Sequence, residues 1–297
     1  MTVFRRAVRG GETCPYRGLV VDYESAVLPV TLTAAYGWLD VDVVNHLWLA
    51  QAVIGAAYYP WIWGSYNPAT CELTVAGTKP APGYGDSYIH LLPGQQSFMT
   101  FFNSGGSLAH YYGTYDAAGE PTYVGSLSAI YGNASHGGII DTVHGLWWAG
   151  TDSGGNASLQ YGHITGGVPV SDGTYASGTG ASQYIPCGVD PDNMLLFVYS
   201  SVAPLTRVLS YDATGAITGE VATLADCVQR CGVDGWAWST NQILAAAYYP
   251  AHLTGQVVDY QGATVMPWPV LAVDHDAQIA FGFDLASNSI CAGFYCN

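Results

Sequence analysis

The stretch Leu205–Leu224 reads LTRVLSYDATGAITGEVATL and has the form of a β-hairpin: an alternating apolar run, a turn with Asp and Gly, and a second run. Similar turns, most of them led by tyrosine, recur along the chain at nearly equal spacing. They are centred on Tyr66, Tyr115, His163, Tyr211 and Tyr260, with steps of 49, 48, 48 and 49 residues. Such regular self-similarity predicts a repeat architecture.

A second motif keeps the same spacing and consists of an apolar residue, an aspartate and a strand-like run, as in Val189–Leu196. Aspartate suits a tight turn because its carboxylate can accept backbone N–H groups of the residues that follow. We therefore expect the repeated aspartates to be structural turn residues and not a ring of metal ligands. They are Asp42, Asp141, Asp190, Asp234 and Asp274.

These motifs divide each repeat into four short strands, which is the pattern of a propeller blade. Five full repeats leave an incomplete unit at each end of the chain, Gly18–Leu32 and Leu271–Cys296. Joining the two units would make a sixth blade and satisfy strand edges that would otherwise stay unpaired. The sequence thus predicts an all-β, six-bladed β-propeller over residues 18–297, whose last blade is closed by the N- and C-terminal strands, after an N-terminal arm at 1–17.

The segment Val189–Tyr199, followed by Leu205–Gly215, resembles the blade of NHL-like six-bladed β-propellers. That group includes scaffolds, receptors and hydrolases, so the resemblance implies a fold and not one function. For propeller hydrolases of the lactonase type it would imply a calcium held by inward-facing Glu, Asn and Asp near the axis. The five glutamates of this chain lie in the arm or next to hairpin turns, and the seven cysteines lack C-x-x-C spacing. We therefore expect no metal and no other cofactor.

Charge is distributed unevenly along the chain, whose formal net charge is −15. The first seventeen residues carry four arginines and one glutamate, while residues 18–297 carry three basic and 21 acidic residues. An acidic body repels nucleic acid and anionic membrane, so neither is an expected partner. The basic arm is either a solvated terminus or an assembly arm that docks on an acidic partner, through Arg5, Arg6, Arg9 and Arg17.

Aromatic residues mark the loops where one repeat passes to the next. In a propeller these loops share one face around the central opening, where aromatic rings can stack on sugars or on a protein surface. The alternative is that each ring braces the neighbouring blade. The residues concerned are Tyr36, Trp38, Tyr84, Tyr88, Tyr131 and Tyr184.

The leading functional expectation is a structural or interaction module without enzymatic activity. The chain has neither the apolar run of a signal peptide nor a membrane-spanning segment, and its surface is poor in lysine. These features favour a virion component made in the cytoplasm, such as a phage tail or head appendage, which binds other structural proteins and a surface glycan or receptor. Two alternatives are a lactonase- or glycosidase-like hydrolase that uses Asp190, Asp192 and Asn193, and a carbohydrate-binding lectin.

Overall fold

The computed structural model describes residues 23–31, 38–51, 60–82, 86–103, 109–128, 138–153, 156–176, 184–200, 205–224, 242–245, 256–259, 270–274, 276–277, 279–284 and 287–294. Most of these residues belong to antiparallel β-strands, and one short 3-10 helix spans Pro93–Gln95. Across these ranges no helix is long and apolar enough to cross a membrane. The arm at 1–17, with Arg5, Arg6, Arg9 and Arg17, lies outside them.

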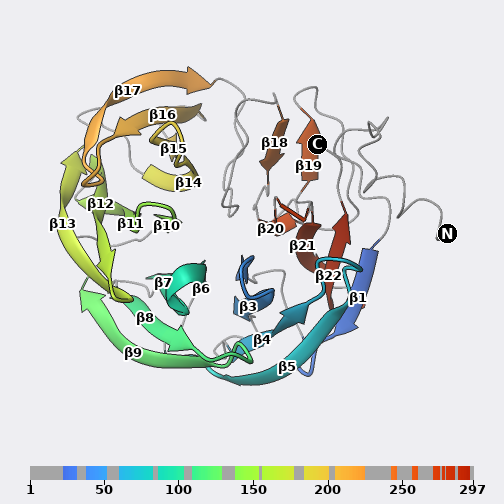
Figure 1. Cartoon of the computed structure of the whole chain (residues 1–297). Helices are drawn as coiled ribbons and strands as arrows, with labels where there is room; N and C mark the ends of the chain where they lie inside the picture. Colours follow the sequence, from blue (N-terminus) through green and yellow to red (C-terminus); the bar gives the residue numbers. More distant parts are fainter. Residues whose placement is uncertain are drawn as a thin grey trace.

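Four of the sheets are each built from four consecutive strands, paired in chain order. They are the first sheet, β2 (Trp38–Asp42), β3 (Leu47–Gln51), β4 (Pro60–Tyr66) and β5 (Leu73–Pro80); the second sheet, β6 (Asp86–Leu92), β7 (Ser97–Asn103), β8 (Ala109–Tyr115) and β9 (Pro121–Ser128); the third sheet, β10 (Gly138–Asp141), β11 (Leu146–Ser153), β12 (Asn156–Thr165) and β13 (Val168–Ala176); and the fourth sheet, β14 (Tyr184–Asp190), β15 (Leu195–Ser200), β16 (Leu205–Tyr211) and β17 (Ile217–Leu224). A two-stranded hairpin, β18 (Gln242–Ala245) and β19 (Gln256–Asp259), follows. The sheets stand around a common centre, with strands such as β6, β10 and β14 on the inside and β9, β13 and β17 on the outside (Figure 1).

The closing sheet joins the two ends of the chain. It contains β20 (Val270–Asp274), β21 (Ile279–Asp284) and β22 (Ser289–Phe294), and its outer strand is β1 (Tyr23–Val27). β1 runs antiparallel to β22, with Tyr23 opposite Gly293 and Val27 opposite Ser289. The predicted pairing of N- and C-terminal strands in one sheet is therefore confirmed.

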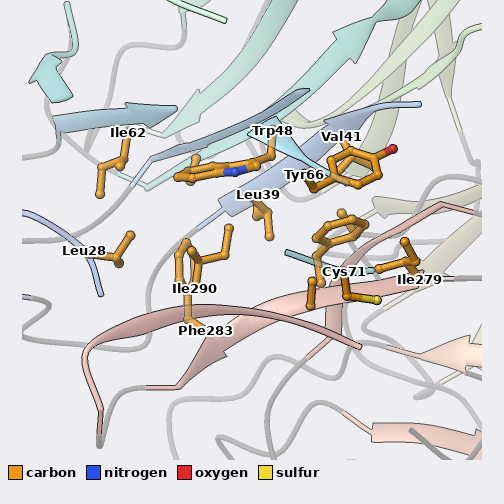
Figure 2. Close-up of a cluster of buried hydrophobic side chains, with 14 of the residues drawn as sticks. Leu28, Leu39, Val41, Trp48, Ile62, Tyr66, Cys71, Ile279, Phe283 and Ile290 are labelled. Carbon is orange, nitrogen blue, oxygen red and sulfur yellow. The ribbon is translucent and has the colours of Figure 1, made fainter. Parts of the chain in front are cut away.

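The closing sheet packs on the first sheet through a hydrophobic core (Figure 2). Trp48 and Ile62 of the first sheet meet Phe281 and Ile290 of the closing sheet, and all four side chains are 0% exposed. Burying apolar side chains of this size contributes about 2 kcal/mol each. Alternating apolar residues on short strands thus fasten one sheet to the next around the ring.

Large rings on the second strand of a sheet are accommodated by glycine on the third strand. A Cβ atom added to Gly64 would lie 2.6 Å from the Trp48 ring, and one added to Gly113 would lie 2.6 Å from the Phe98 ring. The fourth sheet has neither partner and pairs Leu196 with Leu209 at the corresponding place. The aromatic residue and the glycine are therefore replaced together in the fourth sheet, whereas the closing sheet keeps the glycine and pairs Ala280 with Gly293.

The repeated aspartates cap the turn between the first and second strands of their sheets. Oδ1 of Asp42 accepts the N–H groups of Val44 and Asn45, both at 2.9 Å. Oδ1 of Asp141, Asp190 and Asp274 accepts N–H groups in the same way, from residues two or three positions ahead. Asp234 lies outside the described residues.

The second carboxylate oxygen of three of these aspartates bonds a tyrosine of the neighbouring sheet. Tyr115 donates its hydroxyl to Oδ2 of Asp42 at 2.6 Å, and Tyr211 donates to Oδ2 of Asp141 at 2.8 Å. Tyr66 donates to Oδ2 of Asp274 at 2.8 Å and so connects the first sheet to the closing sheet. We call these three contacts the Tyr–Asp bridges.

Burial, and next the hydrogen bond to the carboxylate, raises the pKa of each bridging tyrosine. The hydroxyl therefore remains protonated and continues to donate throughout the neutral range. A buried carboxylate needs such donors, because without them its charge would be poorly compensated.

The junction of the second and third sheets has no Tyr–Asp bridge, because both partners are replaced. Leu92 occupies the aspartate position of the second sheet, and Ile164 occupies the tyrosine position of the third. The backbone fixes this alignment: the N–H of Ile164 donates to the carbonyl of Gly145, as the N–H of Tyr66 does to that of His46. The expectation that His163 takes the tyrosine position is wrong by one residue. Leu92 and Ile164 instead belong to one apolar cluster.

Replacing Tyr115 with Phe is expected to lower the free energy of unfolding by about 2 kcal/mol, because the buried Asp42 carboxylate loses a donor. Urea unfolding at pH 7 measures the change. Tyr123→Phe is the control, since Tyr123 is 43% exposed, and should change stability by less than about 0.5 kcal/mol. Equal effects of the two substitutions would contradict the bridge.

Candidate functional site

The innermost strands bring two ionisable side chains together. Both occupy the same position of their sheets, two residues before the end of the first strand. Asp40 stands there in the first sheet, before Asp42, and His90 stands there in the second sheet, before Leu92. In the other described sheets this position holds Ile139, Gly188 and Ala272. Among the five four-stranded sheets that the structure describes, acid and base groups at this position therefore occur only in two adjacent ones.

Asp40 connects the first strands of these two sheets. Its Oδ1 accepts the N–H of Val41 at 2.8 Å, and its Oδ2 accepts the N–H of Leu91, on β6, at 2.7 Å. Oδ2 also lies 3.9 Å from Nδ1 of His90. The Asp40 side chain is 10% exposed and that of His90 is 5% exposed, so both are nearly enclosed by protein.

His90 is oriented by the third sheet. Its Nε2–H donates to the carbonyl oxygen of Gly138, on β10, at 2.9 Å. In the neutral imidazole the other nitrogen, Nδ1, then carries a lone pair and faces Asp40. A Cβ atom at Gly138 would lie 2.3 Å from the Phe101 ring, so glycine is needed at this place. Three consecutive sheets thus hold one carboxylate and one oriented imidazole.

A second histidine lies deeper between the second and third sheets. His110, on β8, is 0% exposed, and its ring packs edge-on against Phe101 at 5.2 Å and Trp147 at 5.7 Å between centroids. Burial lowers the pKa of His110 to about 4, although the nearby Gln160 amide opposes the shift. Neither ring nitrogen of His110 has a hydrogen bond of good geometry to the described residues. His110 is therefore held in the neutral form.

Most of the aromatic residues expected to bind a partner lie, wholly or by their side chains, outside the described residues. Tyr36, Tyr84 and Tyr131 lie outside the described residues, and the side chains of Trp38 and Tyr88 do so as well, although their backbones belong to β2 and β6. Tyr184 is 1% exposed and packs in the core between the third and fourth sheets. The Arg207 guanidinium lies 5.9 Å from the centre of its ring. A ring so buried offers little surface to a partner.

The residues of the hydrolase alternative lie in a turn and bond one another. Asn193 donates its side-chain N–H to Oδ2 of Asp190 at 2.8 Å, while Asp192 is exposed. The three side chains therefore share one turn, at a different place from Asp40 and His90.

The described residues do not fit the calcium that the lactonase resemblance implies. Calcium in proteins takes six to eight oxygen ligands, several from carboxylates. Within the part of the chain that the structure describes, no three His, Cys, Asp or Glu side chains converge in a way that could hold a metal ion. No step of the chemistry proposed below passes through a metal.

Comparison with known proteins identifies the fold. No family model and no curated protein matches the chain. A candidate 6-phosphogluconolactonase from Bacteroides uniformis matches with a TM-score of 0.58 and 14% identity, over 89% of this chain and 82% of that one. A calcium-binding protein, regucalcin, from Agrobacterium tumefaciens matches with a TM-score of 0.51 and 14% identity, over 92% and 95%. The fold is a β-propeller.

One further match is partial. A candidate 6-phosphogluconolactonase from Bacteroides fragilis has a TM-score of 0.46 and 14% identity, over 69% of this chain. The match covers 58% of that protein, so this chain spans little more than half of its length.

These similarities correct the functional expectations drawn from the sequence. The expected virion component without enzymatic activity, including its phage tail or head assignment, is contradicted, because the propeller resembles a candidate 6-phosphogluconolactonase. Nothing in the comparisons supports an NHL or phage association. The expectation rested on the lack of a signal-peptide-like or membrane-spanning run and on a lysine-poor surface, and a propeller enzyme can have all of these features.

Sequence reasoning missed Asp40, His90 and His110. The signal for the first two was present, because both stand two positions before the end of a first strand, where the other repeats have Ile, Gly or Ala. It could be recognised only with the repeats aligned at the correct residue. His110 had no comparable signal, since burial of a single histidine depends on the neighbouring sheet.

Stability should fall in acid because of His110. The unfolded chain binds a proton on this histidine near pH 6.5, whereas the folded chain does so only near pH 4. The free energy of unfolding therefore falls by up to about 3 kcal/mol as the pH falls from about 6.5 to below 4. Replacing His110 with Phe, which keeps an aromatic ring against Phe101 and Trp147, is expected to remove this part of the pH dependence.

Urea unfolding at pH 7 and at about pH 4 measures the difference between parent and variant. His163→Gln is the control, because the His163 side chain is 42% exposed. An acid dependence that is the same in the parent and in His110→Phe would show that this histidine does not cause it.

Proposed function

We propose that this propeller is a hydrolase of lactones, with its reaction centre at Asp40 and His90. The observation that carries the proposal is the paired carboxylate and oriented imidazole on the innermost strands, with Asp40 Oδ2 and His90 Nδ1 3.9 Å apart. The match to a candidate 6-phosphogluconolactonase at a TM-score of 0.58 supports the same reaction class. It does so only as an analogy of fold.

The separation of the two groups suits a shared water molecule. A distance of 3.9 Å is too long for a direct hydrogen bond, yet one water can reach both atoms. His90 can act as the general base because its Nε2–H donates to the Gly138 carbonyl, which places the basic lone pair on Nδ1, the nitrogen that faces Asp40. Asp40 stabilises the imidazolium that then forms, as the carboxylate does in other acid–base pairs.

The proposed reaction adds this water across the lactone ester bond. The water oxygen attacks the carbonyl carbon while its proton passes to Nδ1 of His90. The ring C–O bond then breaks, and the imidazolium returns the proton to the leaving oxygen. The product is an open-chain hydroxy acid, and no other reactant is required.

Charge favours an unphosphorylated substrate. The two described basic side chains other than histidine are both engaged, Lys79 with Glu120 at 2.9 Å and Arg207 with Glu220 at 2.7 Å. Residues 18–297 carry 21 acidic groups against three basic ones, which repels an anionic phosphate ester. We therefore expect neutral aldonolactones to be preferred over their 6-phosphates.

The test is hydrolysis of γ- and δ-aldonolactones, with and without phosphate, followed by titration of the acid released. Asp40→Asn and His90→Gln are each expected to lower kcat/KM at least about 100-fold, because a general base contributes about that much. His163→Gln, at an exposed histidine, is the control and should retain activity. Absence of hydrolysis of any lactone, or full activity in both site variants, would contradict the proposal.

We further infer that the ring contains six sheets. Five four-stranded sheets are described, and the hairpin β18–β19 lies in the chain between the fourth sheet and the closing sheet. The spacing of the repeat supports a full sheet there, because Tyr260 follows Tyr211 by 49 residues. Tyr260 itself lies outside the described residues.

A double-mutant cycle tests the count. If six sheets form the ring, Asp190→Asn and Tyr260→Phe should show a coupling energy of at least about 1 kcal/mol, similar to that of Asp141→Asn and Tyr211→Phe. Asp192→Asn with Tyr260→Phe is the control, because Asp192 is exposed beside Asp190. Strict additivity of Asp190→Asn and Tyr260→Phe would argue against a sheet in this position.

A further inference from the structure

The interface between the second sheet (β6–β9) and the third sheet (β10–β13), called here the histidine seam, differs from the other described interfaces. Tyr–Asp bridges join the closing and first, the first and second, and the third and fourth sheets. At the histidine seam, Leu92 and Ile164 replace both bridge partners and belong to one apolar cluster. This interface therefore lacks the charge-assisted Tyr–Asp bond that the other three possess, and it is crossed instead by the bond of His90 to the Gly138 carbonyl and by that of the Gly167 N–H to Oε1 of Gln95.

The histidine seam also buries two imidazoles. His90 lies 5.8 Å from Phe101, and Phe101 lies 5.2 Å from His110, between ring centroids. Trp147, from the third sheet, completes the contact with His110 at 5.7 Å. His110 and Trp147 are both 0% exposed.

Among the described side chains that face His110, none carries a negative charge, and the Gln160 amide offers only a neutral acceptor. The third sheet presents Trp147, which does not titrate, and Gln160, which is neutral. On its own sheet, His90 is already bonded to the Gly138 carbonyl and lies beside Asp40. The other titratable groups of the packed strands are engaged elsewhere: Tyr111 with Tyr123, Tyr115 with Asp42, Asp141 with Tyr211, and His163 with Asp172. The rings of Tyr112 and Tyr161 lie against Gly125 and Gly173.

We propose that the histidine seam is an acid-operated opening in the ring, at which protonation of His110 separates the second and third sheets. An imidazolium enclosed by Phe101 and Trp147 has no counter-ion among the described side chains, so keeping its charge buried is unfavourable. Parting the sheets lets water reach the ring and removes that cost. The other three described interfaces resist parting because each would have to break a Tyr–Asp bridge.

The opening would also displace His90, because the Gly138 carbonyl that orients this ring belongs to the third sheet. Acid would then switch off the proposed hydrolase by parting its site. Parting of the sheets does not depend on the reaction itself. Backbone exchange therefore tests the opening independently of the lactone assay, and a failure of one can be told from a failure of the other.

Amide hydrogen exchange at pH 7 and at about pH 4, corrected for the intrinsic rate, tests the opening. Peptides covering β8, β11 and β12 are expected to exchange at least about tenfold faster in acid, while peptides covering β15 and β16 change little. In His110→Phe the acceleration should disappear, and in His163→Gln it should persist. The double substitution Leu92→Asp with Ile164→Tyr, which introduces a bridge, should also suppress it.

Two results would overturn the proposal. One is acceleration of equal size in all described sheets, which would indicate global acid unfolding. The other is acceleration at the histidine seam that is unchanged in His110→Phe.

Discussion

The ring depends on a hydrogen bond between neighbouring sheets that is repeated with little change. A turn aspartate uses one carboxylate oxygen to cap its own turn and the other to receive a tyrosine hydroxyl from the next sheet. One side chain therefore fixes both the local backbone and the packing of two sheets. Because Tyr66 reaches Asp274 in the same way, the closure of the ring uses the same contact as its interior.

The bridge also explains which substitutions the repeat accepts. A buried carboxylate without its donor, or a buried hydroxyl without its acceptor, costs free energy, whereas removing both costs little. Leu92 and Ile164 follow this rule, because they replace the aspartate and the tyrosine together and lie in one apolar cluster. The same logic links the aromatic residues of the second strands to the glycines of the third strands.

Much of the fold could be predicted because the repeat is marked by characteristic residues at its turns. The Asp and Tyr positions gave the four-stranded units, and the leftover segments at the two ends gave the closing sheet. The error at His163 arose because a turn centred on a polar residue suggested the alignment, whereas backbone hydrogen bonds set it at Ile164.

The site was harder to predict because its members belong to different sheets. Asp40 and His90 are 50 residues apart in sequence, and each is an isolated polar residue in an apolar strand. Only the arrangement of β2, β6 and β10 brings the carboxylate, the imidazole and the Gly138 carbonyl together. The aromatic residues of the loops therefore predicted a binding surface, whereas the ionisable pair lies on the innermost strands.

The pairing of β1 with β22 has a consequence for biosynthesis. Tyr23 leaves the ribosome long before Gly293, its partner in the closing sheet, has been made. During translation the early strand has no native edge to join, and the nascent ring remains open until the final strand emerges. Such a distant pairing slows folding and exposes strand edges, so molecular chaperones that shield emerging chains should matter most for this step.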